Sequence, residues 1–160
     1  MIDNVSIGHK DSSGSKLFEI SMPRFGLGVW QMSDMECEAS ILHAFKNGYR
    51  LIDTATAYGN ETAVGEAIRK SEIPRDEIFV VTKLRRVHAT GFDETIIQCK
   101  ESLERLGLDY VDLYLVHAPP EDISVRGEVW KAMEECLKLG LTRSIGVSNY
   151  GIKHLEDMKN

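Results

Sequence analysis

The stretch that joins residues 48 and 83 reads GYRLIDTATAYGNETAVGEAIRKSEIPRDEIFVVTK. It begins with a short apolar run at residues 49–52, which is typical of a buried strand. Residues 61–71 have the spacing of a short amphipathic helix, and a second apolar run follows at residues 78–81. A strand, a helix and a strand in this order predict two parallel strands joined by a helix that covers them.

The same unit repeats on both sides of this stretch. Short apolar runs start 24 to 33 residues apart, at residues 25–29, 49–52, 78–81, 111–116 and 143–147. The intervening segments predict helices: one opening with the capping box at residues 33–36, one at 61–71, one from about 93 to 107, one carrying Val125, Val129, Met133 and Leu137, and one starting near Gly151. Residues 1–22 predict a β-hairpin around the turn cluster at residues 11–15.

Two architectures contain such a repeat: a doubly wound Rossmann sheet and a (β/α)₈ barrel. Gly26 and Gly28 supply two glycines of the dinucleotide fingerprint, but Gln31 occupies the place of the third. We therefore expect an α/β fold of the (β/α)₈ TIM-barrel type, with about five βα units after the hairpin. A complete barrel takes about 250 residues, so we expect residues 1–160 to be one domain that is truncated at its C-terminus.

Composition excludes several classes of function. The chain of 160 residues has a formal net charge of −6 with scattered basic residues, which argues against a nucleic-acid partner. It contains no apolar run long enough to span a membrane, and its polar start does not resemble a signal peptide. Its three cysteines show no metal-ligand spacing, so we expect buried free thiols, no metal and a cytoplasmic location: Cys37, Cys99 and Cys136.

Polar side chains follow four successive strands. They are Asp53 with Tyr58 five residues later, Lys83, His117, and the pair Ser148 and Asn149. In a barrel of parallel strands these positions meet at one end, which is where such folds place their active sites.

These residue types suit general acid catalysis. The phenol of a free tyrosine has a pKa of about 10, and a neighbouring ammonium group favours its ionised form. Asp53 could keep the Lys83 ammonium charged, and His117 could donate a hydrogen bond to a substrate carbonyl. None of these groups supplies electrons, so a reduction would need a hydride cofactor. Taken singly, each residue also has a structural explanation: a turn aspartate, a solvated lysine or a structural histidine.

Residues 48–61 resemble the signature of the aldo-keto reductase family. The resemblance extends to GLGVW at residues 26–30, VTK at 81–83, LDYVDLYLVH at 108–117 and IGVSN at 145–149. It implies an NADPH-dependent oxidoreductase that reduces aldehydes and ketones to alcohols. We expect the full-length enzyme to be a monomer whose partner is a small carbonyl compound.

The resemblance also implies a role for each matching residue. Tyr58 would be the proton donor, Lys83 and Asp53 would adjust its acidity, and His117 would position the carbonyl. Residues near the cofactor would be Gly28, Val29, Trp30, Asp53, Ser148 and Asn149. Those that contact substrate would be Trp30, which could also be a simple core residue, Tyr58 and His117.

Two positions depart from the family pattern. Arg85 and Arg86 stand where an aromatic residue is common, and Ala118 stands where tryptophan is common. We expect a preference for polar carbonyl compounds. The family's later segment, which grips the adenosine 2′-phosphate, is absent from residues 1–160, so we expect this chain alone to be inactive and poorly soluble. The alternative is a catalytically inactive remnant or a nucleotide-sensing regulatory barrel.

Overall fold

Two sheets organise the computed structural model, which describes residues 4–10 and 16–158. The first is an antiparallel hairpin of β1 (Asn4–Lys10) and β2 (Lys16–Pro23). The second has five parallel strands in the order of the chain: β3 (Leu27–Gly28), β4 (Leu51–Asp53), β5 (Phe79–Leu84), β6 (Leu113–Val116) and β7 (Ile145–Val147). The hairpin is therefore confirmed, while its expected turn at residues 11–15 lies outside the described residues.

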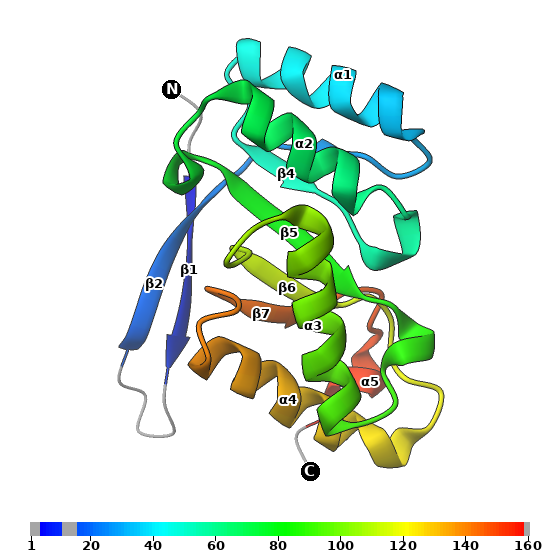
Figure 1. Ribbon diagram of the computed structural model, residues 1–160. Coiled ribbons are helices and arrows are strands. Elements are labelled where there is room, and N and C mark those ends of the chain that lie inside the picture. The colour runs from blue at the N-terminus through cyan, green and yellow to red at the C-terminus, as the bar shows by residue number, and fades with distance from the viewer. Residues whose placement is uncertain (1–3, 11–15, 159–160) are drawn as a thin grey trace.

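A helix follows each parallel strand. The helices are α1 (Asp34–Lys46), α2 (Glu61–Ser71), α3 (Phe92–Leu106), α4 (Arg126–Lys138) and α5 (Ile152–Asp157). Short 3₁₀ turns lie in the loops: η1 (Thr56–Tyr58), η2 (Arg75–Glu77), η3 (Arg86–His88) and η4 (Ile123–Val125). Figure 1 shows α1 to α4 stacked in order along one face of the five-stranded sheet. Each strand lies beside its predecessor, as in the wall of a barrel, so the predicted α/β repeat is confirmed.

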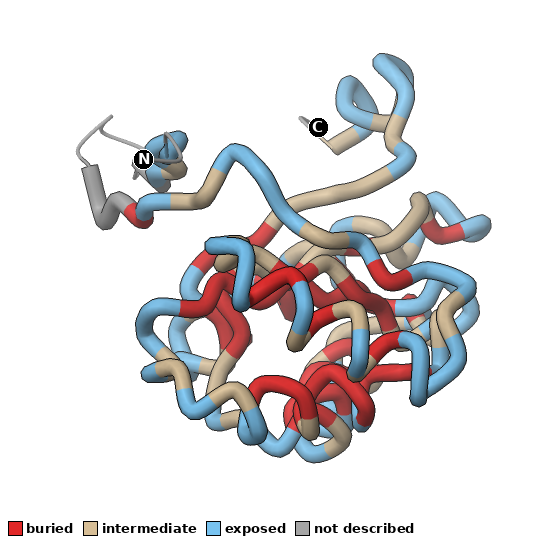
Figure 2. The backbone as a smooth tube through the Cα atoms, turned by 90° about the horizontal axis from the view of Figure 1, so that it is seen from above, coloured by how far each residue is buried: buried red, intermediate tan, exposed pale blue. Residues whose placement is uncertain are grey.

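The five-stranded sheet packs on both faces. Side chains such as Ile52, Val80 and Tyr114 face the helices and belong to the larger core. Phe79 and Val81 point to the opposite face, where they form a smaller cluster that contacts hairpin residues, Ile20 among them. Figure 2 shows the buried residues concentrated where helices and sheet meet. The hairpin thus covers part of the inner face of the wall.

Local signals set the ends of the helices. Ser33 accepts from the Glu36 backbone while the Glu36 carboxylate accepts from the Ser33 backbone, which is the predicted capping box. Gly107 ends α3 with φ +64°, a conformation that favours glycine. Gly65 serves packing instead: a Cβ built there would lie 2.0 Å from the Leu106 carbonyl oxygen, so α2 and α3 approach closely at this point.

Several element boundaries differ from the prediction. The first parallel strand has only two residues, because residues 25 and 26 make no pairing with β4. Val125 closes the 3₁₀ turn η4 rather than lying in α4. All three cysteines are buried free thiols, as predicted. Within residues 4–10 and 16–158, no helix has the length and apolar character needed to cross a bilayer.

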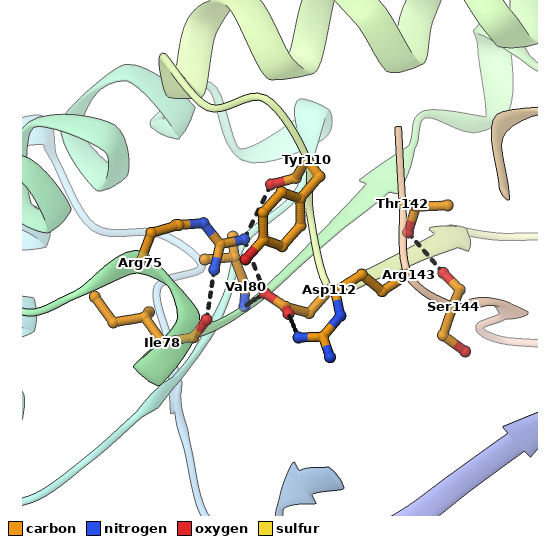
Figure 3. A network of polar contacts seen from close by, with 8 residues as sticks. All are labelled: Arg75, Ile78, Val80, Tyr110, Asp112, Thr142, Arg143 and Ser144. Atoms are coloured by element: carbon orange, nitrogen blue, oxygen red, sulfur yellow. Dashed lines mark hydrogen bonds and ion pairs between the residues drawn. The ribbon is translucent and has the colours of Figure 1, made fainter. Parts of the chain in front are cut away.

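A buried carboxylate ties the N-terminal ends of the central strands together. Asp112, only 1% exposed, accepts from Arg75 at 2.8 Å, from Arg143 at 2.9 Å and from the Val80 backbone at 2.9 Å. Arg75 also donates to the backbone oxygens of Ile78 and Tyr110 (Figure 3). This network joins the strands at the end of the sheet where they begin, whereas Lys83 lies near the end where they stop.

Candidate active site

Lys83 is the centre of the polar cluster at the C-terminal ends of the strands. It is the fifth of six residues in β5, and its side chain is buried. The ammonium forms an ion pair with Asp53, the last residue of β4, and donates to the Thr54 backbone oxygen at 2.9 Å. A buried ammonium group needs such partners to remain charged. Because β4 and β5 are adjacent and parallel, their ends bring Asp53 and Lys83 together.

Tyr58 reaches the same ammonium from the loop after β4. The 3₁₀ turn η1 carries it, and Gly59 with φ +74° closes that turn. Lys83 Nζ donates to the Tyr58 hydroxyl oxygen at 3.4 Å and lies 5.0 Å from the centre of the ring. A hydroxyl that accepts this bond keeps its own O–H free to donate elsewhere.

His117 also packs against Tyr58. It directly follows β6, and its ring centre is 5.6 Å from that of Tyr58, at an interplanar angle of 76°. Partial burial and the nearby Lys83 ammonium lower the pKa of His117, while Asp53 acts in the opposite direction. A neutral imidazole still has one N–H, so His117 can donate a hydrogen bond at neutral pH.

Ser148 and Asn149 extend the site beyond β7. Asn149 Nδ2 donates to the His117 backbone oxygen at 2.8 Å and to Ser148 Oγ at 3.1 Å. Asn149 has φ +60°, a conformation in which asparagine is among the least strained non-glycine residues. Its amide group is thus held beside His117 at the same edge of the sheet.

The three predicted residues at the end of β3 and just after it differ in burial. Gly28 is exposed and Val29 is fully buried, while Trp30 is 66% exposed and does not line the cavity beside His117. Val29 N donates to the Asp53 backbone oxygen at 3.1 Å, which holds this loop against β4. The structure therefore brings Tyr58, Lys83, Asp53 and His117 into one cluster and leaves Trp30 in solvent.

Asn60 holds these loops together, a role that was not predicted from the sequence. Asn60 is 1% exposed; its Nδ2 donates to the Val29 backbone oxygen at 2.9 Å, and its Oδ1 accepts from Thr54 Oγ1 at 2.8 Å. It thereby links the loop after β3 to the loop that carries Tyr58. Asn60 is the N-cap residue of α2, but its side chain makes no capping hydrogen bond there.

A cavity of about 350 Å³ opens beside the cluster. The residues that line it come from the loops after four strands: Ala57, Arg85, Arg86, Val87, His117, Ala118 and Asn149. Tyr58 does not itself line the cavity, but its ring centre lies 5.6 Å from that of His117, which does. The cavity has room for a small polar compound, and the adjacent Tyr58 hydroxyl is a group that could donate a proton to it.

Comparison of the sequence with known families gives a match to the aldo/keto reductase family over residues 22–160. An aldo-keto reductase of Mycolicibacterium vanbaalenii is 54% identical over 138 residues, which cover 86% of this chain and 49% of that protein. The chain spans about half the length of the curated relatives it matches.

Solved structures give the same likeness. The crystal structure of an aldo/keto reductase from Brucella melitensis is 41% identical with a TM-score of 0.83, covering 96% of this chain and 58% of that one. An aldo-keto reductase of Bombyx mori in complex with NADP is 32% identical with a TM-score of 0.84, and the match covers 99% of this chain and 55% of that one. The five parallel strands and their helices thus correspond to part of a (β/α)₈ barrel, in agreement with the predicted fold class.

Proposed function

This chain belongs to the aldo/keto reductase family, and on that premise we propose that residues 1–160 form part of one NADPH-dependent reductase domain that converts aldehydes and ketones to alcohols. The observation that carries the proposal is the contact of Lys83 Nζ with the Tyr58 hydroxyl oxygen at 3.4 Å, beside His117. This contact places a proton donor and a positive charge next to each other, and the neighbouring His117, a second hydrogen-bond donor, lines the cavity.

Tyr58 is the general acid in this proposal. Its hydroxyl accepts from Lys83, so its own proton is available to the oxygen of a carbonyl compound in the cavity. As the proton leaves, the Lys83 ammonium stabilises the phenolate that remains. Asp53 and the Thr54 backbone oxygen hold the ammonium in place during this change.

His117 orients the carbonyl group. A neutral imidazole beside Tyr58 can donate to the carbonyl oxygen, and this hydrogen bond strengthens as negative charge develops there. The lowered pKa of His117 supports this role, because the imidazole then stays neutral at physiological pH. Carbonyl oxygen and proton donor would thus meet in a fixed geometry.

The chemistry of the donor set fits a nicotinamide cofactor. When bound, NADPH supplies the hydride that none of the protein side chains can provide. Asn149 Nδ2 is engaged by His117 and Ser148, which leaves its Oδ1 as an acceptor for an amide N–H such as that of a carboxamide. We therefore assign Ser148 and Asn149 to the nicotinamide end. Gly28, Val29 and Trp30 are assigned to the loop that flanks the cofactor and the substrate.

The proposal is tested on the protein expressed from its complete reading frame. NADPH absorbance is followed with 4-nitrobenzaldehyde for the wild type and for Tyr58→Phe, which should lower kcat by about 10²- to 10⁴-fold because the general acid is lost. Tyr110→Phe, a tyrosine at the opposite end of the sheet, serves as the matched control and should keep activity. No NADPH oxidation by the wild type would refute the proposal, and NADPH binding without turnover would favour a nucleotide-sensing barrel.

A further inference from the structure

Arg85 continues the inner face of β5 past Lys83. Phe79 and Val81 point into the inner cluster, whereas Val80 and Leu84 belong to the core under the helices, so odd-numbered side chains face inward. Arg85 has φ −66° and ψ 135°, so the chain is still extended there. Side chains therefore continue to alternate between the two faces of the sheet as far as Arg85. Its side chain therefore emerges on the same face as Lys83, one position nearer the open end.

The cavity beside His117 is positively charged on this side. Arg85 and Arg86 both line it, and none of its lining residues is acidic. Arg86 is ion-paired with Glu121, 2.7 Å from Arg86 Nη2, so its charge is partly compensated. The Arg85 guanidinium has no hydrogen-bond or ion-pair partner among residues 4–10 and 16–158. The Arg85 guanidinium thus lines the cavity, and no carboxylate among the described residues forms an ion pair with it.

A guanidinium group binds a carboxylate through two parallel N–H donors, a geometry that gives orientation as well as attraction. Ala118 also lines this cavity of about 350 Å³, and its side chain is only a methyl group, so it takes up little of the space that a substituent would need. A carbonyl compound that carries a carboxylate could place its carbonyl at Tyr58 and His117 and its anionic end at Arg85.

We propose that Arg85 anchors the carboxylate of anionic carbonyl substrates, such as oxo acids and carboxylated aldehydes, and so determines which carbonyl compounds the site prefers. The assignment rests on the reductase function proposed above and names the substrate class of that site. Arg85 is a binding residue in this assignment: it holds the substrate and takes no part in proton transfer.

Two substrates of closely similar shape test the proposal: 4-carboxybenzaldehyde and its neutral methyl ester, methyl 4-formylbenzoate. With the protein expressed from its complete reading frame, the wild type should have the higher kcat/KM for the carboxylate. Arg85→Ala should lower that value by about 10- to 100-fold, as expected for lost hydrogen bonds to a charged group. The loss should lie mainly in KM, and the ester should be affected less than about twofold because it makes no ion pair with Arg85.

Three controls distinguish carboxylate binding by Arg85 from other effects of the substitution. Arg85→Lys keeps the charge without the fork and should restore part of the loss. Arg69→Ala, which removes an exposed arginine on α2, should change neither substrate. The NADPH dissociation constant of Arg85→Ala, measured by fluorescence, should equal that of the wild type; a weaker value would mean that Arg85 binds a cofactor phosphate and would overturn the proposal.

The outcomes distinguish a failure of the Arg85 proposal from a failure of the proposed reductase function. If the wild type reduces the ester as well as or better than the carboxylate, the anchor is refuted while the reductase function stands. An equal loss for both substrates in Arg85→Ala also refutes the anchor, because the residue then acts through the shape of the loop. If neither aldehyde is reduced, the proposed function fails and the anchor fails with it.

Discussion

Arg105 on α3 donates from Nε to the Glu61 carboxylate at the start of α2, over 2.7 Å. Glu61 is only 2% exposed, and its other oxygen accepts from Thr82 Oγ1 on β5 at 2.6 Å. One carboxylate therefore joins two helices and the strand that carries Lys83. It also fixes the start of α2, three residues after Tyr58.

Removing one partner of this ion pair should destabilise the fold strongly. Arg105→Met leaves the Glu61 carboxylate buried without its cation, and such losses cost about 3–5 kcal/mol in the free energy of unfolding. Urea unfolding of the protein expressed from its complete reading frame measures the change. The matched variant Arg69→Met breaks an exposed pair with Glu66 and should cost less than about 1 kcal/mol. Equal effects of the two substitutions would contradict the role assigned to Glu61.

Gly65 and Gly127 form a second matched pair of sites. Alanine is favoured over glycine in a helix by about 1 kcal/mol, and Gly127→Ala in α4 should gain stability because its Cβ meets nothing within 4 Å. Gly65→Ala should instead lose about 1–3 kcal/mol, since its Cβ would strike the Leu106 backbone and push α2 from α3. The midpoint temperatures of thermal unfolding of both variants are compared with that of the wild type. A stabilised Gly65→Ala variant would show that the α2–α3 contact is looser than described.

The stability of the protein should depend on His117 below neutral pH. Burial and the Lys83 charge lower its pKa in the folded state below the value of 6.5 that it has in the unfolded chain. As the pH falls below about 6.5, the unfolded chain takes up this proton more readily, so the free energy of unfolding decreases. His117→Gln should lose less stability than the wild type on acidification from about pH 7 to about pH 5.5.

The comparison is made by urea unfolding at both pH values. His43→Gln, a substitution at an exposed position of α1, is the control and should follow the wild type. Identical pH profiles for the wild type and His117→Gln would show that the imidazole titrates alike in both states.

Cys37 should resist alkylation in the folded protein. Burial and, less strongly, the charge of Asp34 raise the pKa of its thiol to about 11, and the thiolate is the reactive form. Mass spectrometry after iodoacetamide treatment near pH 8 should find Cys37 unmodified in the native protein and modified in urea. Rapid labelling of the native protein would mean that α1 opens readily from the sheet.

The sequence predicted the order of strands and helices because each helix carries local signals, such as the Ser33 capping box and the terminal Gly107. The strand lengths were harder to predict, since they depend on which neighbouring residues pair. The first strand has two residues because the paired ladder with β4 contains only Leu27 and Gly28, although Val29 N also donates to the Asp53 backbone oxygen. The clustering of Asp53, Lys83 and His117 followed from one rule: parallel strands end at the same edge.

Long-range polar contacts could not be predicted in the same way. Asp112 binds Arg75, 37 residues away, and Arg143, 31 residues away, and nothing in the local sequence pairs these three charges. Asn60 likewise joins Val29 across 31 residues. Such contacts depend on how whole units stack, and only the folded chain shows them.

The position of the β1–β2 hairpin has a practical consequence. Residues of β1 and β2 lie beside Asp112, at the end where the parallel strands begin. Tyr58 and Lys83 lie at the other end, after β4 and near the end of β5. Figure 1 shows the hairpin at one end of the five-stranded sheet. A fluorescent dye or a surface tether attached at the exposed Asn4 of β1 would therefore lie at the end of the sheet opposite the reacting groups. Exposed positions of β1 are therefore suitable attachment points for immobilised or single-molecule assays.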